Sequence, residues 1–279
     1  MSAPAEVHVR APATTANIGP GFDCAGAALD LWNELELRRT NGSGDEPADR
    51  SHLGVRAFER LVPSAGWSFR FTDRIPQARG LGSSASVVAL GLVAAAIVGS
   101  LEPTADELLA LGLELEGHGD NLAAALTGGV CLTWGTRIAR IADTAPATPI
   151  AVIPDHRVET AASRAALPDT VPHADAAFSA GRAALLGAAL ASNSADLFEA
   201  ALEDRLHEPY RAASSPVLSE VRTRPPARSL GATLSGAGPT VIVWARNGEA
   251  DTCAAELRER FPNEQVLPLT ISPTGAGPT

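Results

Sequence analysis

The stretch "RIPQARGLGSSASVVALGLVAAA", residues 74–96, is the part of the sequence that most constrains the fold. Small residues run from Gly80 to Ser86, interrupted only by Leu81, and lead directly into an apolar segment typical of a buried helix. Glycine lets a backbone approach a ligand closely, and the first turn of a helix leaves about four N–H groups without a partner. The stretch therefore predicts either a serine-capped strand-to-helix turn or a nest of N–H groups for an anion.

Strand and helix patterns surround this stretch without a regular βαβ alternation, which favours an α+β fold. The strand patterns cover residues 6–14, 33–40, 67–75, 128–134, 149–154, 231–246 (two strands around a glycine turn) and 264–272. The helix patterns cover residues 52–62, 83–98, 103–119, 174–204 and 249–261. Thr104 and Glu107 have the spacing of a capping box. The Pro, Thr and Ala content of residues 143–150 predicts a domain boundary there, between residues 1–148 and 149–279.

Composition narrows the class of protein. The chain has 279 residues, 45% of them hydrophobic, and a net charge of −10, which argues against nucleic acid or an anionic membrane as the main partner. We see no signal peptide, and the longest apolar run, Val87–Gly99, is too short to span a bilayer. The three cysteines are too few and too far apart for a disulfide framework or a metal motif. We expect a soluble cytoplasmic protein.

The chain contains no lysine, and all 22 basic residues are arginine. This excludes a Walker A lysine, a Schiff-base lysine and the lysine of protein kinases. If the protein handles phosphates, backbone N–H groups, arginine or a metal ion must neutralise them.

Two further stretches carry polar groups that suit a binding site. In "LELEGHGDN", residues 113–121, three carboxylates and His118 crowd one helix end. They could hold Mg²⁺ beside a phosphate loop, or form an acidic solvated face with a structural histidine. In "APATTANIGPGFDCAG", residues 11–26, Asn17 and Asp23 lie in a loop that is costly to order unless it packs or binds something.

The glycine turn "LSGAGPTV", residues 234–241, is either a plain turn or one in which Ser235 and Thr240 add hydroxyls to a site. A similar segment, "TGAGPT", ends the chain at residues 274–279. We expect this second copy to be a mobile tail.

Together these stretches resemble the GHMP superfamily of small-molecule kinases. The pattern P-x-x-x-G-L-G-S-S-A, Pro76 to Ala85, resembles its phosphate loop, and "APATTANIGPGFD", "EGHGDN" and "LSGAGPTV" are similar to motifs of the homoserine kinase family. Their order and spacing match from about Val7 to Val243. The resemblance implies an N-terminal ATP-binding domain and a C-terminal GHMP-kinase-like domain, with the active site in the cleft between them. It also implies a homodimer that phosphorylates the side-chain hydroxyl of L-homoserine with ATP and Mg²⁺, in threonine biosynthesis.

The resemblance also assigns roles. The residues implied for the ATP phosphates are Pro76, Arg79, Gly80, Leu81, Gly82, Ser83, Ser84, Ala85 and Ser86. Ser84 and Glu116 would hold Mg²⁺, with Glu114 as the alternative ligand, and Asn121 would contact the hydroxyl that is phosphorylated. The residues implied for homoserine are Asn17, Asp23, His118, Asp120, Thr160, Arg164 and Arg211. We expect segment 38–62 to contact the adenine.

In this assignment Asp120 meets the substrate ammonium and the two arginines meet its carboxylate. Arg164 lies in "ETAASRAALP" and Arg211 in "DRLHEPYR". Without the motif match, each arginine would be interpreted as part of a surface ion pair. Gly119 stands where the family commonly has a proline, which affects the expected shape of the Asp120 loop.

Two other functions stay open from the sequence. Another GHMP-type kinase could act on a mevalonate-like alcohol, but such a substrate offers no ammonium to Asp120. A non-catalytic nucleotide-binding homologue is the second alternative, and the presence of both Ser84 and Glu116 argues against it.

Overall fold

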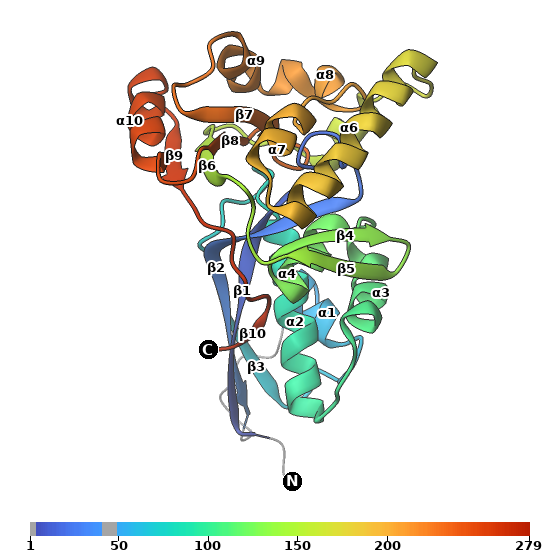
Figure 1. The fold of residues 1–279 in the computed structure, drawn as a ribbon. Helices are drawn as coiled ribbons and strands as arrows, with labels where there is room; N and C mark the ends of the chain where they lie inside the picture. The colour runs from blue at the N-terminus through green and yellow to red at the C-terminus, as the bar shows by residue number, and fades with distance from the viewer. Residues whose placement is uncertain (1–3, 41–48) are drawn as a thin grey trace.

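The computed structural model describes residues 4–40 and 49–279, and its chain forms two antiparallel sheets with helices packed on them (Figure 1). The first sheet has the order β10-β1-β2-β4-β5, and β3 also pairs with β2. Its strands are β1 (Glu6–Ala16), β2 (Ala25–Arg39), β3 (Trp67–Thr72), β4 (Val130–Trp134), β5 (Arg137–Ala142) and β10 (Gly277–Pro278). The mixture of helix and sheet confirms the predicted α+β class.

Among the described residues, four helices belong to this first half of the molecule. They are α1 (Leu53–Phe58), α2 (Ser83–Gly99), α3 (Ala105–Glu116) and α4 (Asp120–Thr127). Helix α2 is buried on most of its circumference, which explains why its sequence is apolar after the serines of its first turn. Helix α3 begins with the predicted capping box, in which Thr104 Oγ1 accepts from Glu107 N at 3.3 Å and Glu107 Oε2 accepts from Thr104 N at 2.7 Å.

The second sheet has the order β7-β8-β6-β9. Its strands are β6 (Thr148–Ile153), β7 (Ser229–Leu234), β8 (Val241–Ala245) and β9 (Gln265–Pro268). The helices of this half are α5 (Thr160–Ala165), α6 (His173–Ser192), α7 (Ala195–Ala201), α8 (Glu208–Arg211), α9 (Pro216–Thr223) and α10 (Ala250–Arg260). Apolar residues of α9 and α10 pack with this sheet in one core, and those of α6 and α7 join both sheets in another. The predicted boundary between residues 148 and 149 falls at the start of β6 and stays a prediction.

The last residues return to the first sheet, as Figure 1 shows. Gly277 and Pro278 pair with Arg10 and Val9 of β1, and Ala276 N donates to Ala125 O at 2.7 Å. The prediction of a mobile tail is therefore wrong. The physical reason is that β1 would otherwise be an edge strand with unpaired backbone groups, and the tail pairs with them. In the described part of the chain, no helix is long and apolar enough to cross a membrane.

Candidate active site

Residues from both halves of the molecule line one cavity of about 680 Å³. It brings together most of the site residues predicted from the sequence. The predicted residues that line it are Asn17, Asp23, Gly80, Gly82, Ser83, Ser84, Ala85, Glu116, His118, Asp120, Asn121, Thr160, Arg164 and Arg211. Pro76, Arg79, Leu81 and Ser86 are absent from its lining.

The loop of Gly80 to Ser86, called the glycine loop here, leads into α2. It places the first turn of this helix at the cavity wall. Gly82 is the N-cap residue, with a left-handed φ of 63°, and no side chain in the described part of the chain caps the helix. The alternative of a serine-capped turn is therefore wrong. A Cβ on Gly82 would lie 1.8 Å from Thr14 Oγ1, so only glycine fits there. Ser83 and Ser84 line the cavity beside the first N–H groups of the helix, an arrangement that suits an anion.

The glycine turn between β7 and β8 holds this loop in place. Ser235 Oγ donates to Gly80 O at 2.6 Å, and a Cβ on Gly80 would lie 2.2 Å from Ser235 O. Gly236, Ala237 and Gly238 line the cavity. The Ser235 hydroxyl thus supports the loop from behind instead of facing a ligand.

Three other loop residues have partners away from the cavity. Leu81 is fully buried in the core, and Ser86 Oγ donates to Ala11 O at 3.1 Å. Arg79 Nη2 contacts Asp155 Oδ1 at 3.0 Å, which ties the loop to the second half of the molecule. These placements give Leu81 and Ser86 structural roles that the motif match did not anticipate.

Ser84 and Glu116 form a pair of oxygen donors at the cavity wall. The Ser84 hydroxyl hydrogen-bonds Glu116 Oε1, and burial raises the pKa of Glu116. Glu114, the alternative ligand, instead pairs with Arg60, which follows α1, at 2.7 Å. No cluster of three or more His, Cys, Asp or Glu side chains in residues 4–40 and 49–279 could hold a metal unaided. A hydroxyl and one carboxylate suit Mg²⁺ that arrives on phosphates, because this ion takes few protein ligands.

Asp120 and Asn121 begin α4 at the cavity wall, close to the loop. Asp120 is 4% exposed. Burial is the main cause that raises its pKa to about 6; the nearby Asp23 contributes to this increase, and the hydrogen bond from Asn121 N opposes it. Asn121 Oδ1 accepts from Thr14 Oγ1 at 2.7 Å and would lie 3.0 Å from a Cβ on Gly82. The amide of Asn121 therefore lies directly against the glycine loop. Sequence reasoning gave Thr14 no role, although it lies in the stretch "APATTANIGPGFD".

The two predicted arginines come from α5 and α8. Arg164 Nη2 contacts Asp23 Oδ1 at 2.6 Å, and Arg211 Nη1 donates to Gly236 O at 3.2 Å. Both guanidinium groups lie over the ring of Phe22, at 5.5 and 5.3 Å from its centroid. The Nε atoms of both arginines are buried and have no hydrogen-bond partner among the described residues. Buried donors of this kind usually have an acceptor, so a carboxylate ligand would satisfy them.

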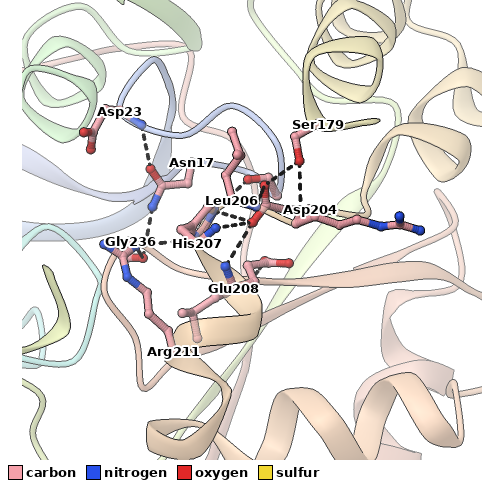
Figure 2. Close-up of polar contacts among 12 residues, drawn as sticks. Asn17, Asp23, Ser179, Asp204, Leu206, His207, Glu208, Arg211 and Gly236 are labelled. Atoms are coloured by element: carbon pink, nitrogen blue, oxygen red, sulfur yellow. Dashed lines mark hydrogen bonds and ion pairs between the residues drawn. The ribbon is translucent and has the colours of Figure 1, made fainter. Parts of the chain in front are cut away.

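At the cavity wall, Asn17 joins its own loop to the glycine turn. Its Nδ2 donates to Gly236 O at 3.0 Å, and its Oδ1 accepts from Asp23 N at 3.0 Å (Figure 2). Behind Arg211, His207 and Asp204 are fully buried, and sequence reasoning did not single out either residue. The only available signal was their spacing before Arg211 in "DRLHEPYR".

The contact of segment 38–62 with adenine stays a prediction. Residues 41–48 of segment 38–62 lie outside the described residues, and none of the described remainder lines this cavity.

Comparison with known proteins identifies relatives along the whole chain. The family model of the GHMP kinases N-terminal domain matches residues 52–129, and that of the GHMP kinases C-terminal domain matches residues 176–263. The homoserine kinase of Clavibacter michiganensis subsp. michiganensis is 39% identical over 97% of this chain and 93% of its own length. The homoserine kinase of Streptomyces avermitilis is 40% identical over 90% and 89%. A crystal structure of homoserine kinase from Cytophaga hutchinsonii, 24% identical, matches 100% of this chain and 99% of its own with a TM-score of 0.88.

Proposed function

Because this chain belongs to the homoserine kinase family of the GHMP kinases, we propose that it phosphorylates the side-chain hydroxyl of L-homoserine with ATP. The product is O-phospho-L-homoserine, and the reaction is a phosphoryl transfer to an alcohol.

One observation carries this proposal: the cavity places charges of both signs beside the glycine loop. Asp23 and Asp120 supply negative charge, and Arg164 and Arg211 supply positive charge. An amino acid carries an ammonium and a carboxylate, so it can replace the Asp23–Arg164 contact with one partner for each group. A mevalonate-like alcohol has no ammonium and would leave the buried carboxylate of Asp120 without a cation.

In the reaction, this chain chiefly binds and orients the two substrates. The N–H groups at the start of α2, with Ser83 and Ser84, would hold the ATP phosphates. Ser84 and Glu116 would hold Mg²⁺, which neutralises phosphate charge when bound. Asn121 lies against the loop, where its amide oxygen can accept a hydrogen bond from the substrate hydroxyl and aim it at the γ-phosphate.

No residue is assigned as a strong general base. Asn121 cannot take up a proton, and Asp120 is assigned to the ammonium. We propose that the hydroxyl proton passes directly to phosphate or solvent. In the cell, this activity would serve threonine biosynthesis in the cytoplasm, and the family likeness favours a homodimer.

A coupled assay of ADP release tests the proposed function. The panel is L-homoserine, D-homoserine, L-threonine, mevalonate and galactose, each with ATP and with Mg²⁺ present or chelated. We expect strong preference for L-homoserine, and no turnover without the metal. Preference for mevalonate or galactose would keep the phosphate loop but contradict the proposed amino-acid pocket. ATP binding without turnover of any alcohol would contradict the kinase function itself.

A further inference from the structure

The inference concerns a buried cluster directly behind Arg211, outside the cavity lining. Asp204 and His207 have fully buried side chains and precede the short helix α8, which ends at Arg211 (Figure 2). His207 and Arg211 are four residues apart, so their side chains share one face of this turn. Neither Asp204 nor His207 has a role in the proposed phosphoryl transfer.

The hydrogen bonds of His207 define its protonation state. Arg211 Nη1 lies 3.1 Å from His207 Nδ1, and a guanidinium can only donate, so Nδ1 must accept. The ring proton is therefore on Nε2, which donates to Gly19 O at 2.8 Å. His207 is thus a neutral imidazole in a single tautomer. Burial lowers its pKa to about 4, which agrees with that state.

Asp204 holds the backbone on which His207 sits. Its Oδ2 accepts from His207 N at 2.7 Å and from Glu208 N at 2.9 Å. Its Oδ1 accepts from Leu206 N at 3.0 Å and lies 3.3 Å from Ser179 Oγ of α6. These bonds satisfy the free N–H groups at the start of α8. The imidazole is therefore presented by a backbone turn that is itself anchored to a long helix.

His207 connects two walls of the substrate pocket. One side of it contacts Arg211, and the other contacts the loop that carries Asn17 and Asp23, through the carbonyl of Gly19. The ring of Phe22 stacks on the imidazole at 4.9 Å, and Arg211 lies over the same ring. Arg211 Nη1 and Asn17 Nδ2 both donate to Gly236 O, at 3.2 and 3.0 Å. These contacts restrict the guanidinium to one orientation.

We propose that His207 is a positioning residue, which orients the guanidinium of Arg211 toward the carboxylate of the amino-acid substrate through its Nδ1 atom. This inference rests on the proposed function, because it assumes a substrate with a carboxylate. A flexible arginine loses side-chain entropy when it binds, and an arginine that is already oriented loses less. His207 acts in this way without touching the substrate.

Two substitutions separate the two contacts of the ring. In His207→Asn the amide oxygen lies near the place of Nδ1 and can accept from Arg211. In His207→Gln the amide nitrogen lies near the place of Nε2 and can donate to Gly19 O, but Arg211 loses the acceptor that Nδ1 provided and keeps only Gly236 O. We expect His207→Gln to raise the KM for L-homoserine about tenfold, the effect of one lost hydrogen bond to a charged group, with kcat and the KM for ATP nearly unchanged. We expect the KM of His207→Asn for L-homoserine to stay within about threefold of the wild-type value.

Three controls identify the route of the effect. With L-homoserinol, in which a CH₂OH group replaces the carboxylate, His207→Gln and wild type should have the same KM. In an Arg211→Ala background, His207→Gln should add no further loss, since residues that act through one another are not additive. Phe198→Leu, in the same half of the molecule and fully buried, should lower Tm without changing the KM for L-homoserine.

Four outcomes would overturn the proposal. They are equal effects of the Asn and Gln variants, the same penalty with L-homoserinol, a penalty that persists without Arg211, and a hydrogen on Nδ1. The last is read on the wild-type protein, whose folding is not in question, from the ¹H–¹⁵N spectrum of the His207 ring, assigned by its contacts with Phe22. Wild-type protein that does not phosphorylate L-homoserine would instead overturn the proposed function, and this inference with it.

Discussion

At the scale of single residues, burial changes what a carboxylate does. Among residues 4–40 and 49–279, no cation donates a hydrogen bond to the Asp120 carboxylate, and its surroundings raise its pKa from the ordinary 3.8 to about 6. A side chain that is costly to keep charged is retained where a ligand can supply the opposite charge. The raised pKa of Asp120 therefore fits the proposed contact of its carboxylate with the ammonium group of the substrate.

The first residue-scale prediction is that Asp120→Asn stabilises the protein and weakens substrate binding. The folded state holds the Asp120 proton more tightly than the unfolded state, so the ionised carboxylate costs stability as pH rises from about 4 through 6. Above pH 6 this cost is about 3 kcal/mol, and the Asn variant avoids it while still accepting from Asn121 N. We expect a higher Tm at pH 7.5, a difference that shrinks toward pH 4, and a KM for L-homoserine raised at least about tenfold.

The pH profile checks the same assignment. In wild type, kcat/KM for L-homoserine should fall as pH drops through about 6, because protonated Asp120 no longer attracts an ammonium. Asp120→Asn should lose this acidic limb of the profile. A collapse of kcat in the variant with an unchanged KM would instead assign Asp120 to proton transfer.

At the scale of elements, the start of α2 illustrates how a binding loop differs from an ordinary helix cap. A serine at the N-cap would satisfy one of the first N–H groups, and the turn would then have less to offer a phosphate. Gly82 takes this position with a positive φ and leaves the N–H groups uncapped by side chains. Thr14 and Asn121 pack so closely against Gly82 that loop, strand β1 and helix α4 form one unit.

We predict that Gly82→Ala raises the KM for ATP by about tenfold or more, because a Cβ 1.8 Å from Thr14 Oγ1 must displace the loop or the threonine. Stability should fall by about 1–3 kcal/mol from the left-handed φ and the clash together. Gly66→Ala is the matched control, since Gly66 has a φ of +84° and open space around it. It should show the conformational cost alone, and a Gly82→Ala enzyme with the ATP affinity of this control would contradict the prediction.

At the scale of the whole molecule, the chain end ties the second half back to the first. After β9 of the second sheet, the chain crosses to β1, where Thr279 N donates to His8 O at 3.2 Å (Figure 1). None of residues 272–279 lines the cavity. The pairing of the chain end with β1 therefore affects the stability of the protein and the association of the two sheets. It does not act directly on the reaction in the cavity.

Removal of residues 274–279 should lower the stability of the protein with little change in the site. The truncation deletes the β10–β1 pairing and the bond from Ala276 N to Ala125 O, at about 1 kcal/mol for each backbone hydrogen bond. We expect thermal unfolding to show a decrease in Tm of about 5 °C or more. At assay temperatures below the lowered Tm, kcat and both KM values should be retained. Thr279→Ala keeps the backbone and serves as the control. A truncated protein with unchanged Tm would show that the pairing contributes nothing.

Much of the fold and most of the site could be predicted because local signals were strong. Helix α2 and the Thr104–Glu107 capping box follow from apolar pattern and spacing. Helix α4 and strand β5 were not predicted. The first is short and has glycines on both sides, and the second lacks a clean alternation, so their structure depends on packing.

The sequence by itself determined the chemistry that the site can offer. The sequence shows which chemical groups are available and in which order. They are given by its lysine-free composition, by the glycine loop and by the ordered acidic and arginine motifs. The tertiary structure alone decided which of these groups meet, because Thr14 and Asn121 are 107 residues apart and Arg164 and Asp23 are 141 apart. It also buries Ser86 in the core, pairs Glu114 with Arg60 and pairs the last residues with β1. The sequence defines the type of each side chain, whereas its direction and its partners follow from packing between segments that are distant in the chain.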